Sequence, residues 1–342
     1  MPLFVGLDAS KHTTAICILN ADGVLVAEGE VGTDPKEIIA FLRGRRERYR
    51  RIGIESMSFA PWIYDGLAKV GFPVICIEAR HAHGVLKARL NKTDRNDARG
   101  IAELMRAGIY KAVHIKSAQS QHAKLLITTR KMLLSKSRDT ENLIRQALLQ
   151  YGLKLAAGGL RNTFHRRVDL VLRDANEPLR SVTEALLGAR AVLVEKAKLI
   201  EGEIVAMARA DPVCRRLMTA PGVAALTALI YKSAIDVPER FANSRDVGVH
   251  LGLTPRIHQS GPVERRSRIS KCGDASARST LFLAARIILV KVKKRSRLKE
   301  WGLEVRARRG FAKASIAVAR KLAVALHRMW MTETDFCDAP VA

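Results

Sequence analysis

Five short apolar segments in the first 78 residues constrain the fold of this 342-residue chain more than any other feature. Each is predicted to be a β-strand, and they cover residues 2–8, 13–19, 24–31, 51–55 and 72–78. Asp22-Gly23 separates the second from the third, and an Asp-Gly pair between apolar segments is a strong hairpin signal. Helical patterns follow the third, fourth and fifth segments. We therefore expect an α/β domain that contains a mixed five-stranded sheet.

The order of these strands is that of the ribonuclease H type of α/β fold. Three antiparallel strands come first, and two parallel strands with helices between them follow. Such a sheet places the first strand beside the fourth, which would bring Asp8 and Glu55 to the same edge. A lone aspartate at a strand end often only forms a turn or caps the next segment. Gly6 lets another backbone or a ligand approach the first strand closely.

Two threonines are expected to cap helices. Thr33 would begin the helix predicted over residues 33–50. Thr93 would begin another, in which Asp94 and Asp97 stand three apart on one face, at roughly 5–6 Å between Cβ atoms. Acids in a first helical turn complement the helix dipole, so the pair also has a purely structural interpretation. Four carboxylates at one edge of a sheet could instead hold two hard divalent cations for phosphodiester chemistry.

Long helical patterns replace the strands from about residue 117 onward. They cover residues 117–151 and 181–210, and Gly158-Gly159 between them turns the chain back. In the second pattern, apolar side chains recur every three or four positions, as in a coiled coil, at Leu186, Ala189, Leu193, Ala197, Ile200, Ile204 and Met207. A seam between two chains and a helical hairpin within one chain explain this recurrence equally well.

These patterns divide the chain into three predicted parts. Residues 1–115 form the α/β domain, residues 116–210 a helical coiled-coil spacer or oligomerisation segment, and residues 211–342 a mostly α-helical C-terminal domain. Pro221-Gly222 in the third part is similar to a helix-hairpin-helix turn, whose backbone amides can meet a phosphate.

The charge of the chain points to a polyanionic partner. The sequence has 59 Lys and Arg against 33 Asp and Glu, a net charge of +26, which makes nucleic acid the leading partner. No apolar run reaches the roughly 18 residues that a membrane span needs, and the N-terminus lacks the layout of a signal peptide. The five scattered cysteines match neither a disulfide framework nor a zinc pattern. We therefore expect a cytoplasmic protein that associates with the nucleoid when bound to DNA, and no membrane partner.

Basic residues gather around a serine in the third part. Ser260 precedes Gly261, a pair that is also common in ordinary loops. The side chains expected to bind nucleic acid are Lys92, Arg256, Arg265, Arg266, Arg268 and Lys271. Residues 291–313 are also dense in Lys and Arg and suit contact with a nucleic-acid backbone, although a solvated helix face has the same composition.

At these residues the sequence resembles the DEDD transposases of insertion sequences, the IS110 family, to which Piv-type DNA invertases are related. The resemblance spans nearly the whole chain. The matching motifs are Val5-Gly-Leu-Asp8, Ile54-Glu55, Asn91-Lys-Thr-Asp94-x-x-Asp97-Ala-Arg99, Pro221-Gly222 and Gly252-Leu-Thr-Pro255 with Ser260-Gly261. The Lys-Thr-Asp-x-x-Asp-Ala run is the most specific of them.

The resemblance implies a site and a reaction. Asp8, Glu55, Asp94 and Asp97 would form the metal-binding tetrad of a RuvC-like domain that uses Mg²⁺ or Mn²⁺, and Ser260 would be the nucleophile of a C-terminal transposase domain. The protein would be a DNA transposase that cuts and rejoins donor and target DNA through a covalent phosphoserine. A bridge RNA would guide it, and it would work as a homodimer or homotetramer.

Three other functions remain open from the sequence. A metal-dependent nuclease of the Holliday-junction type would use the tetrad and leave Ser260 structural. A catalytically idle nucleic-acid-binding protein would use neither. A sugar-kinase or actin-like ATPase is suggested by Val5-Gly-Leu-Asp-Ala-Ser-Lys11, although the sequence has no second phosphate loop or Gly-rich adenosine motif and its charge does not suit a small-molecule kinase.

Overall fold

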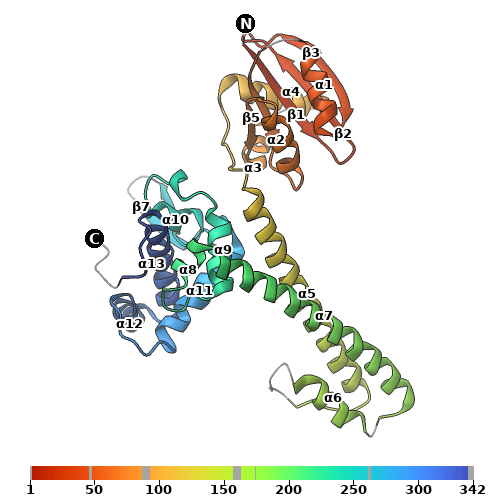
Figure 1. Ribbon diagram of the computed structural model, residues 1–342, viewed down its shortest axis with the longest axis vertical. Helices are drawn as coiled ribbons and strands as arrows, with labels where there is room; N and C mark the ends of the chain where they lie inside the picture. Colours follow the sequence, from red (N-terminus) through yellow and green to blue (C-terminus); the bar gives the residue numbers. More distant parts are fainter. Residues whose placement is uncertain are drawn as a thin grey trace. The chain divides into compact units, whose positions relative to one another are not determined.

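The computed structural model describes residues 2–45, 48–86, 93–156, 163–173, 175–260 and 263–337. The chain divides into two compact units, Met1–Lys116 and Ser117–Ala342, drawn in Figure 1. The three-part division drawn from the sequence stays a prediction. None of the described helices combines the length and the apolar composition of a membrane-spanning segment.

A mixed five-stranded sheet forms the centre of the first unit. Its strands are β1 (Leu3–Ala9), β2 (Thr13–Leu19), β3 (Leu25–Gly32), β4 (Tyr49–Glu55) and β5 (Val74–Ile77). The order across the sheet is β3-β2-β1-β4-β5; β1 pairs with β2 antiparallel and with β4 parallel. The predicted mixed sheet, with the first strand beside the fourth, is therefore confirmed, and it fits a ribonuclease H-like domain.

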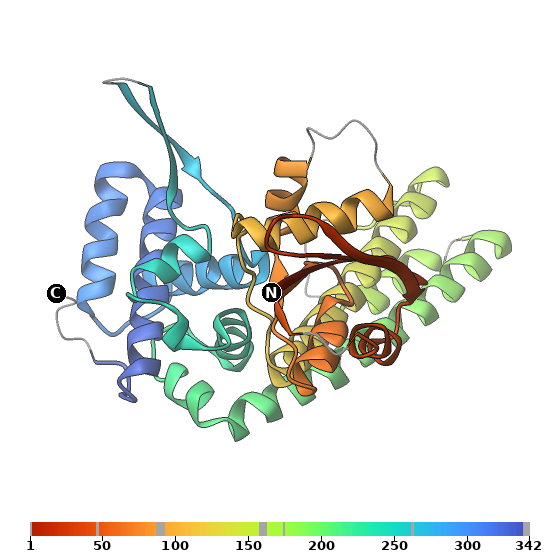
Figure 2. The same ribbon diagram turned by 90° about the horizontal axis from the view of Figure 1, so that it is seen from above.

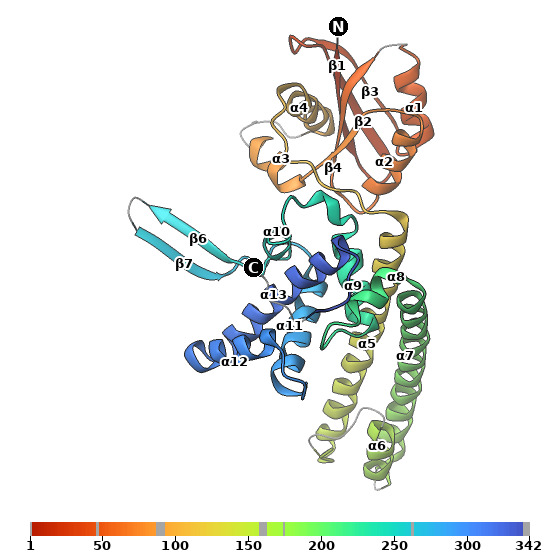
Figure 3. The same cartoon turned by 60° about the vertical axis from the view of Figure 1, so that its left-hand side comes forward.

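Helices cover both faces of this sheet (Figure 3). They are α1 (Pro35–Arg43), α2 (Ala60–Lys69), α3 (Ala79–Leu86) and α4 (Asp94–Ala107). Side chains alternate between the faces of a strand, so odd-numbered residues of β1 such as Val5 and Leu7 pack with Ile38 and Ile63 of α1 and α2. The even-numbered Phe4 shares a core with α4 instead.

The first helix differs from its prediction at both ends. Asp34, not Thr33, is the N-cap, and its carboxylate accepts a hydrogen bond of 2.7 Å from the Lys36 amide. The Thr33 hydroxyl donates to the Ser10 carbonyl, which ties the helix entry to β1. The helix ends at Arg43 and does not continue to residue 50, because Tyr49 already belongs to β4, where it is buried and donates to the Leu42 carbonyl.

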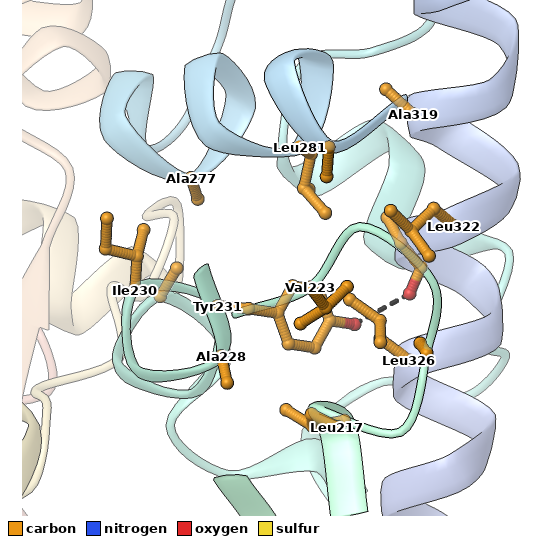
Figure 4. Packing of buried hydrophobic residues seen from close by; sticks show 14 of the residues in the cluster. Leu217, Val223, Ala228, Ile230, Tyr231, Ala277, Leu281, Ala319, Leu322 and Leu326 are labelled. Atoms are coloured by element: carbon orange, nitrogen blue, oxygen red, sulfur yellow. Dashed lines mark hydrogen bonds between the residues drawn. The ribbon is translucent and has the colours of Figure 1, made fainter. Parts of the chain in front are cut away.

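The second unit is mostly helical, as predicted. Its helices are α5 (Ala118–Gln150), α6 (Phe164–Leu172), α7 (Glu177–Ala210), α8 (Pro212–Leu217), α9 (Ala225–Ile235), the 3₁₀ turn η2 (Pro238–Arg240), α10 (Asp246–His250), α11 (Ala275–Val290), α12 (Arg297–Arg309) and α13 (Phe311–Met331). Tyr231 of α9 lies at the centre of its core, fully buried, and its hydroxyl donates to the Ala323 carbonyl at 2.7 Å (Figure 4).

The long helices α5 and α7 pack against each other along their length, and both also contact α9 (Figure 1). Ala197 and Ile204 of the predicted seam are buried in this packing, whereas Ala189 is exposed. The next residue, Arg190, is buried instead, and its guanidinium forms an ion pair with Glu141 of α5 at 2.8 Å. The pattern therefore corresponds to a helix pair within one chain, and its use between chains stays a prediction.

One element of the second unit was not predicted. No strand is expected from the sequence after residue 78, yet Pro255–Ser260 and Val263–Ile269 form the antiparallel strands β6 and β7. The hairpin extends beyond the helices of this unit (Figures 2 and 3). Val263 and Ile269 are the only apolar residues of β7, so its sequence carries no apolar alternation to mark a strand.

Candidate active site

The carboxylate of Asp8 belongs to the face of the sheet that α4 covers. Gly6 shares that face, being two residues earlier on β1, and α4 passes directly over it. A Cβ atom at Gly6 would lie within 3.0 Å of the α4 backbone at Ala98, Ile101 and Ala102. The close backbone approach predicted at Gly6 is therefore confirmed. It fixes the distance of α4 from the strand that carries Asp8.

Glu55 lies on the same face of the neighbouring strand. Leu7 pairs with Ile54 in the parallel ladder, so Asp8 and Glu55 are the next residues of their strands and leave the sheet at one edge. Gly53, two residues before Glu55, also faces α4, where a Cβ would lie 2.7 Å from Met105 Cγ. The expectation that the two carboxylates reach the same edge is met, and both are partly buried.

The start of α4 points to this edge as well. Arg51 at the opposite end of β4 donates to the Met105 carbonyl at 2.8 Å, so the last turn of α4 lies at the amino end of the strand. The helix then passes over Gly6 at Ala98, and its first turn continues toward the carboxyl end of β1. Asp94 and Asp97 both belong to that first turn. All four predicted carboxylates therefore come from one face and one edge.

Thr93 begins α4 as predicted. Its hydroxyl accepts a hydrogen bond of 3.2 Å from the Asn96 amide. Arg95 points away from the acids to β3, where its Nε donates to Glu28 at 2.6 Å. The cap, the close approach at Gly6 and this ion pair together hold the first turn. Asp94 is exposed and Asp97 is half-buried.

A further carboxylate at this edge was missed in the sequence. Glu78 directly follows β5, whose Ile77 pairs with Glu55. It forms an ion pair of 2.7 Å with Lys111, and this hydrogen bond, with Lys111, Arg80 and His81 nearby, lowers the pKa of its carboxyl group. Because a lysine already neutralises Glu78, it is a weaker candidate for binding a cation than the other four. The order of strands in the sheet was the signal that could have found it.

The donor set of the edge fits a hard divalent cation, because carboxylate oxygens are the ligands that Mg²⁺ and Mn²⁺ prefer. Within the described part of the chain, no three His, Cys, Asp or Glu side chains stand close enough together to hold an ion unaided. Mg²⁺ is commonly held by one or two carboxylates together with oxygens of the substrate phosphate. The arrangement therefore fits an ion that is completed by its substrate.

Ser260 is the last residue of β6 and pairs with Val263 across the end of the hairpin. The structure does not describe the side chains of Ser260, Arg265 and Arg266. Gly261 and Lys92 lie outside the described residues. The strand register places His258 opposite Arg265 and Ile257 opposite Arg266. Ser260 belongs to the second unit and the four carboxylates to the first.

The base of the hairpin is held by backbone contacts. Gly252 and Gly273 both have positive φ, and a Cβ at either would meet the backbone of the other segment within 3.0 Å. Arg278 of α11 donates to the carbonyls of Leu251 and Cys272 at 3.1 and 2.8 Å. The two strands therefore leave the helical body from a fixed point.

The remaining predicted nucleic-acid contacts are exposed at this base. Arg256 is exposed, although its guanidinium also donates to the Ser270 carbonyl at 3.0 Å. Arg268 and Lys271 are exposed too, and Lys271 has a φ of 57°. A positive φ on a lysine is uncommon and marks the tight turn that leads from β7 back to α11.

The sequence matches two family models. Residues 5–153 match the model of the DEDD transposases of IS110, described as a transposase, and residues 214–300 match the model described as the transposase IS116/IS110/IS902 family. The first match contains all four carboxylates and the second contains Ser260.

Bacterial relatives agree with these matches. The chain is 34% identical over 274 residues to the transposase for insertion sequence element IS1111A of Coxiella burnetii, covering 78% of this chain and 74% of that one. It is 26% identical over 275 residues to the transposase for insertion sequence element IS1328 of Yersinia enterocolitica, covering 80% and 81%. A probable family 20 transposase of Pseudomonas aeruginosa is 25% identical over 290 residues, with 83% and 85% covered.

These matches make the chain, with its ribonuclease H-like sheet followed by a helical unit, a transposase of the DEDD type. The chain belongs to the IS116/IS110/IS902 family of transposases.

Proposed function

We propose that this transposase cuts and rejoins donor and target DNA with two groups of residues. Asp8, Glu55, Asp94 and Asp97 would hold Mg²⁺ or Mn²⁺ together with oxygens of the DNA phosphate, and Ser260 is the nucleophile. The observation that carries the proposal is the meeting of β1, β4 and the first turn of α4 at one edge, in a chain of this family.

The serine chemistry follows from the groups named. The Ser260 hydroxyl loses its proton and its oxygen attacks the phosphorus of a DNA phosphodiester. The bond from phosphorus to the 3′ oxygen breaks, and that oxygen takes up a proton to give a free 3′-hydroxyl and a phosphoserine. Rejoining reverses these steps, when a 3′-hydroxyl of another strand attacks the phosphoserine and releases Ser260.

The carboxylates serve the same step by binding and orientation. Asp8 and Glu55 are carried by paired strands, and Asp94 and Asp97 by the first turn of α4, whose distance from β1 is set by the contact at Gly6. A divalent ion bound by them would stabilise the negative charge that develops on the displaced oxygen. Their own charge keeps a bare phosphate away until a cation is present.

The partners in the proposal extend beyond DNA. The net charge of +26 is compatible with binding a bridge RNA together with DNA, in which case base pairing would select the sequence. The basic residues Arg256, Arg265, Arg266, Arg268, Lys271 and Lys92 would hold the backbones. A homodimer or homotetramer, joined through the helical segment 116–210 as a coiled coil, would bring Ser260 of one copy to the carboxylates of another.

A denaturing gel tests the proposal. The full chain, co-expressed with the RNA of its element, is incubated with Mg²⁺ and end-labelled DNA that carries the element ends and target. We expect a protein–DNA adduct that disappears in Ser260→Ala and in Asp97→Asn. Two matched controls should keep the adduct: Ser267→Ala, on the other strand of the hairpin, and Glu103→Gln, later on α4.

The other outcomes separate the alternatives. A metal-dependent nuclease would give cleaved DNA ends without a protein–DNA adduct. In that case Ser260→Ala would still cleave and Asp97→Asn would not. Binding of DNA with no cleavage by the unsubstituted chain would favour an idle nucleic-acid-binding protein. Either result would overturn the serine mechanism.

A further inference from the structure

A groove of about 330 Å³ lies within the second unit, between α5, α9 and α11. It contains none of the residues discussed for catalysis. One wall is α5, which contributes Arg130, Lys131 and Arg138. These residues, with Ile127 and Leu134, follow helical spacing and share one face of α5.

The opposite wall carries hydroxyl groups. Ser276, Ser279 and Thr280 come from the first turns of α11, and Thr280 also donates to the Ser276 carbonyl at 2.8 Å. Leu226 and Ile230 of α9 line the groove as well. No acidic residue lines it among those that the structure describes. A cationic wall, a hydroxyl wall and an apolar lining therefore meet in one place.

The cations of the groove are not neutralised equally. Arg130 pairs with Glu201 of α7 at 3.2 Å, which anchors its guanidinium, but its Nε is fully buried and has no partner in the described structure. Lys131 and Arg138 are exposed, and neither forms an ion pair with any described acid. Lys131 and Arg138 are therefore the cations of the groove that remain available to an anion.

We propose that this groove binds the sugar-phosphate backbone of a nucleic-acid strand. A phosphodiester offers the negative oxygens that Lys131, Arg138 and the hydroxyl groups can bind. Its sugar offers an apolar surface to Leu226 and Ile230. The volume is at the lower end of the range of about 300–1,000 Å³ for ligand pockets, which suits one nucleotide unit of a strand.

This inference goes beyond the proposed chemistry and does not need it. The family membership and the net charge of +26 make nucleic acid the polyanion to test. The groove would position a strand on the helical unit, against the first turns of α11 that follow the base of the hairpin. Contacts of this kind fix register and carry no sequence information of their own.

A binding titration tests the groove. Fluorescence anisotropy of a short labelled duplex DNA and of a labelled RNA hairpin is followed with the full chain at several salt concentrations. Both titrations use the Ser260→Ala background without divalent ions, so cleavage cannot affect the result. Two variants are compared with this background. One is the double variant Lys131→Gln/Arg138→Gln, and the other is Ser279→Glu.

The expected result is a weaker affinity and a smaller salt dependence. The double variant should reduce the slope of log K against log salt by about 2 for a duplex, because each lost phosphate contact contributes about 0.9. Ser279→Glu should weaken binding by placing a carboxylate in the groove, whereas Ser279→Gln tests the added bulk without charge. Lys136→Gln is the matched control, since Lys136 lies on the opposite face of α5 and pairs with Asp139.

Comparison of the DNA duplex with the RNA hairpin shows which nucleic acid supplies the phosphodiester that the groove binds. An effect on one probe alone assigns the groove to DNA or to RNA, and an effect on both assigns it to the shared backbone. Circular dichroism confirms that the variants remain folded. If the double variant and Ser279→Glu bind both probes as tightly as Lys136→Gln does, with the same slope, the groove does not bind nucleic acid.

Discussion

Replacing Gly6 by alanine should break the contact that places α4 over the sheet. The added Cβ would lie within 3.0 Å of three residues of the α4 backbone, and a backbone cannot rotate aside as a flexible side chain can. Overpacking of a core costs about 1–3 kcal/mol when side chains can adjust. Here the helix itself must move, so we expect about 3 kcal/mol, at the upper end of that range.

Hydrogen exchange measures this cost locally. A loss of about 3 kcal/mol raises the population of the open sheet by roughly 150-fold, since 1.4 kcal/mol corresponds to a factor of ten. The slowest amides of β1 and β4 should therefore exchange about 150-fold faster in Gly6→Ala. DNA cleavage should fall as well, because the movement of α4 carries Asp94 and Asp97 away from Asp8.

Gly84→Ala provides the matched control. Gly84 belongs to α3 of the same unit, and a Cβ there would meet nothing within 4 Å. Alanine at such a helical position should stabilise the protein by about 0.4–1 kcal/mol. If β1 amides of Gly6→Ala exchange at the rates of the unsubstituted chain and cleavage is unchanged, the close approach of α4 does not position the acids.

Three further outcomes follow from the second unit. Tyr231→Phe removes the hydroxyl bound to Ala323 in a fully buried place, and calorimetry should show a loss of about 1–2 kcal/mol. Burial lowers the pKa of His327 below its ordinary value of 6.5, so the unfolded chain binds the proton first and stability falls as the pH drops below 6.5. Urea unfolding at several pH values should show this dependence weakened in His327→Gln. Thiol labelling of the native chain, followed by mass spectrometry, should be rapid at the exposed Cys272 and Cys337 and slow at the three buried cysteines.

The first unit could be predicted well because its signals are local. A short apolar segment marked each strand, and the Asp-Gly turn marked the hairpin between the second and third strands. The pairing of β1 with β4 follows from the strand order, which places Asp8 and Glu55 at one edge. The end of α1 was predicted wrongly because residues 45–48, after the C-cap Gly44, have a helical composition again. The burial of Tyr49 against Phe72 decides where the strand begins.

The second unit shows where local patterns give no information. The β6–β7 hairpin is held by backbone pairing and by the contacts of Gly252 and Gly273 at its base, and neither leaves an apolar alternation in the sequence. The groove combines residues from α5, α9 and α11, which are far apart in the chain. No spacing within one segment could indicate it.

Both parts of the candidate active site are held by close packing at glycines. Gly6, two residues before Asp8, meets the backbone of α4, whereas Gly53, two residues before Glu55, meets side chains of α4. The strands that lead to Ser260 leave the helical body between Gly252 and Gly273, which both meet backbone atoms. A glycine contact fixes the backbone without using polar side chains, so the carboxylates and the serine remain available for chemistry. Substitutions at these glycines should therefore remove activity in proportion to the movement of the backbone, although glycine has no side chain to take part in the chemistry.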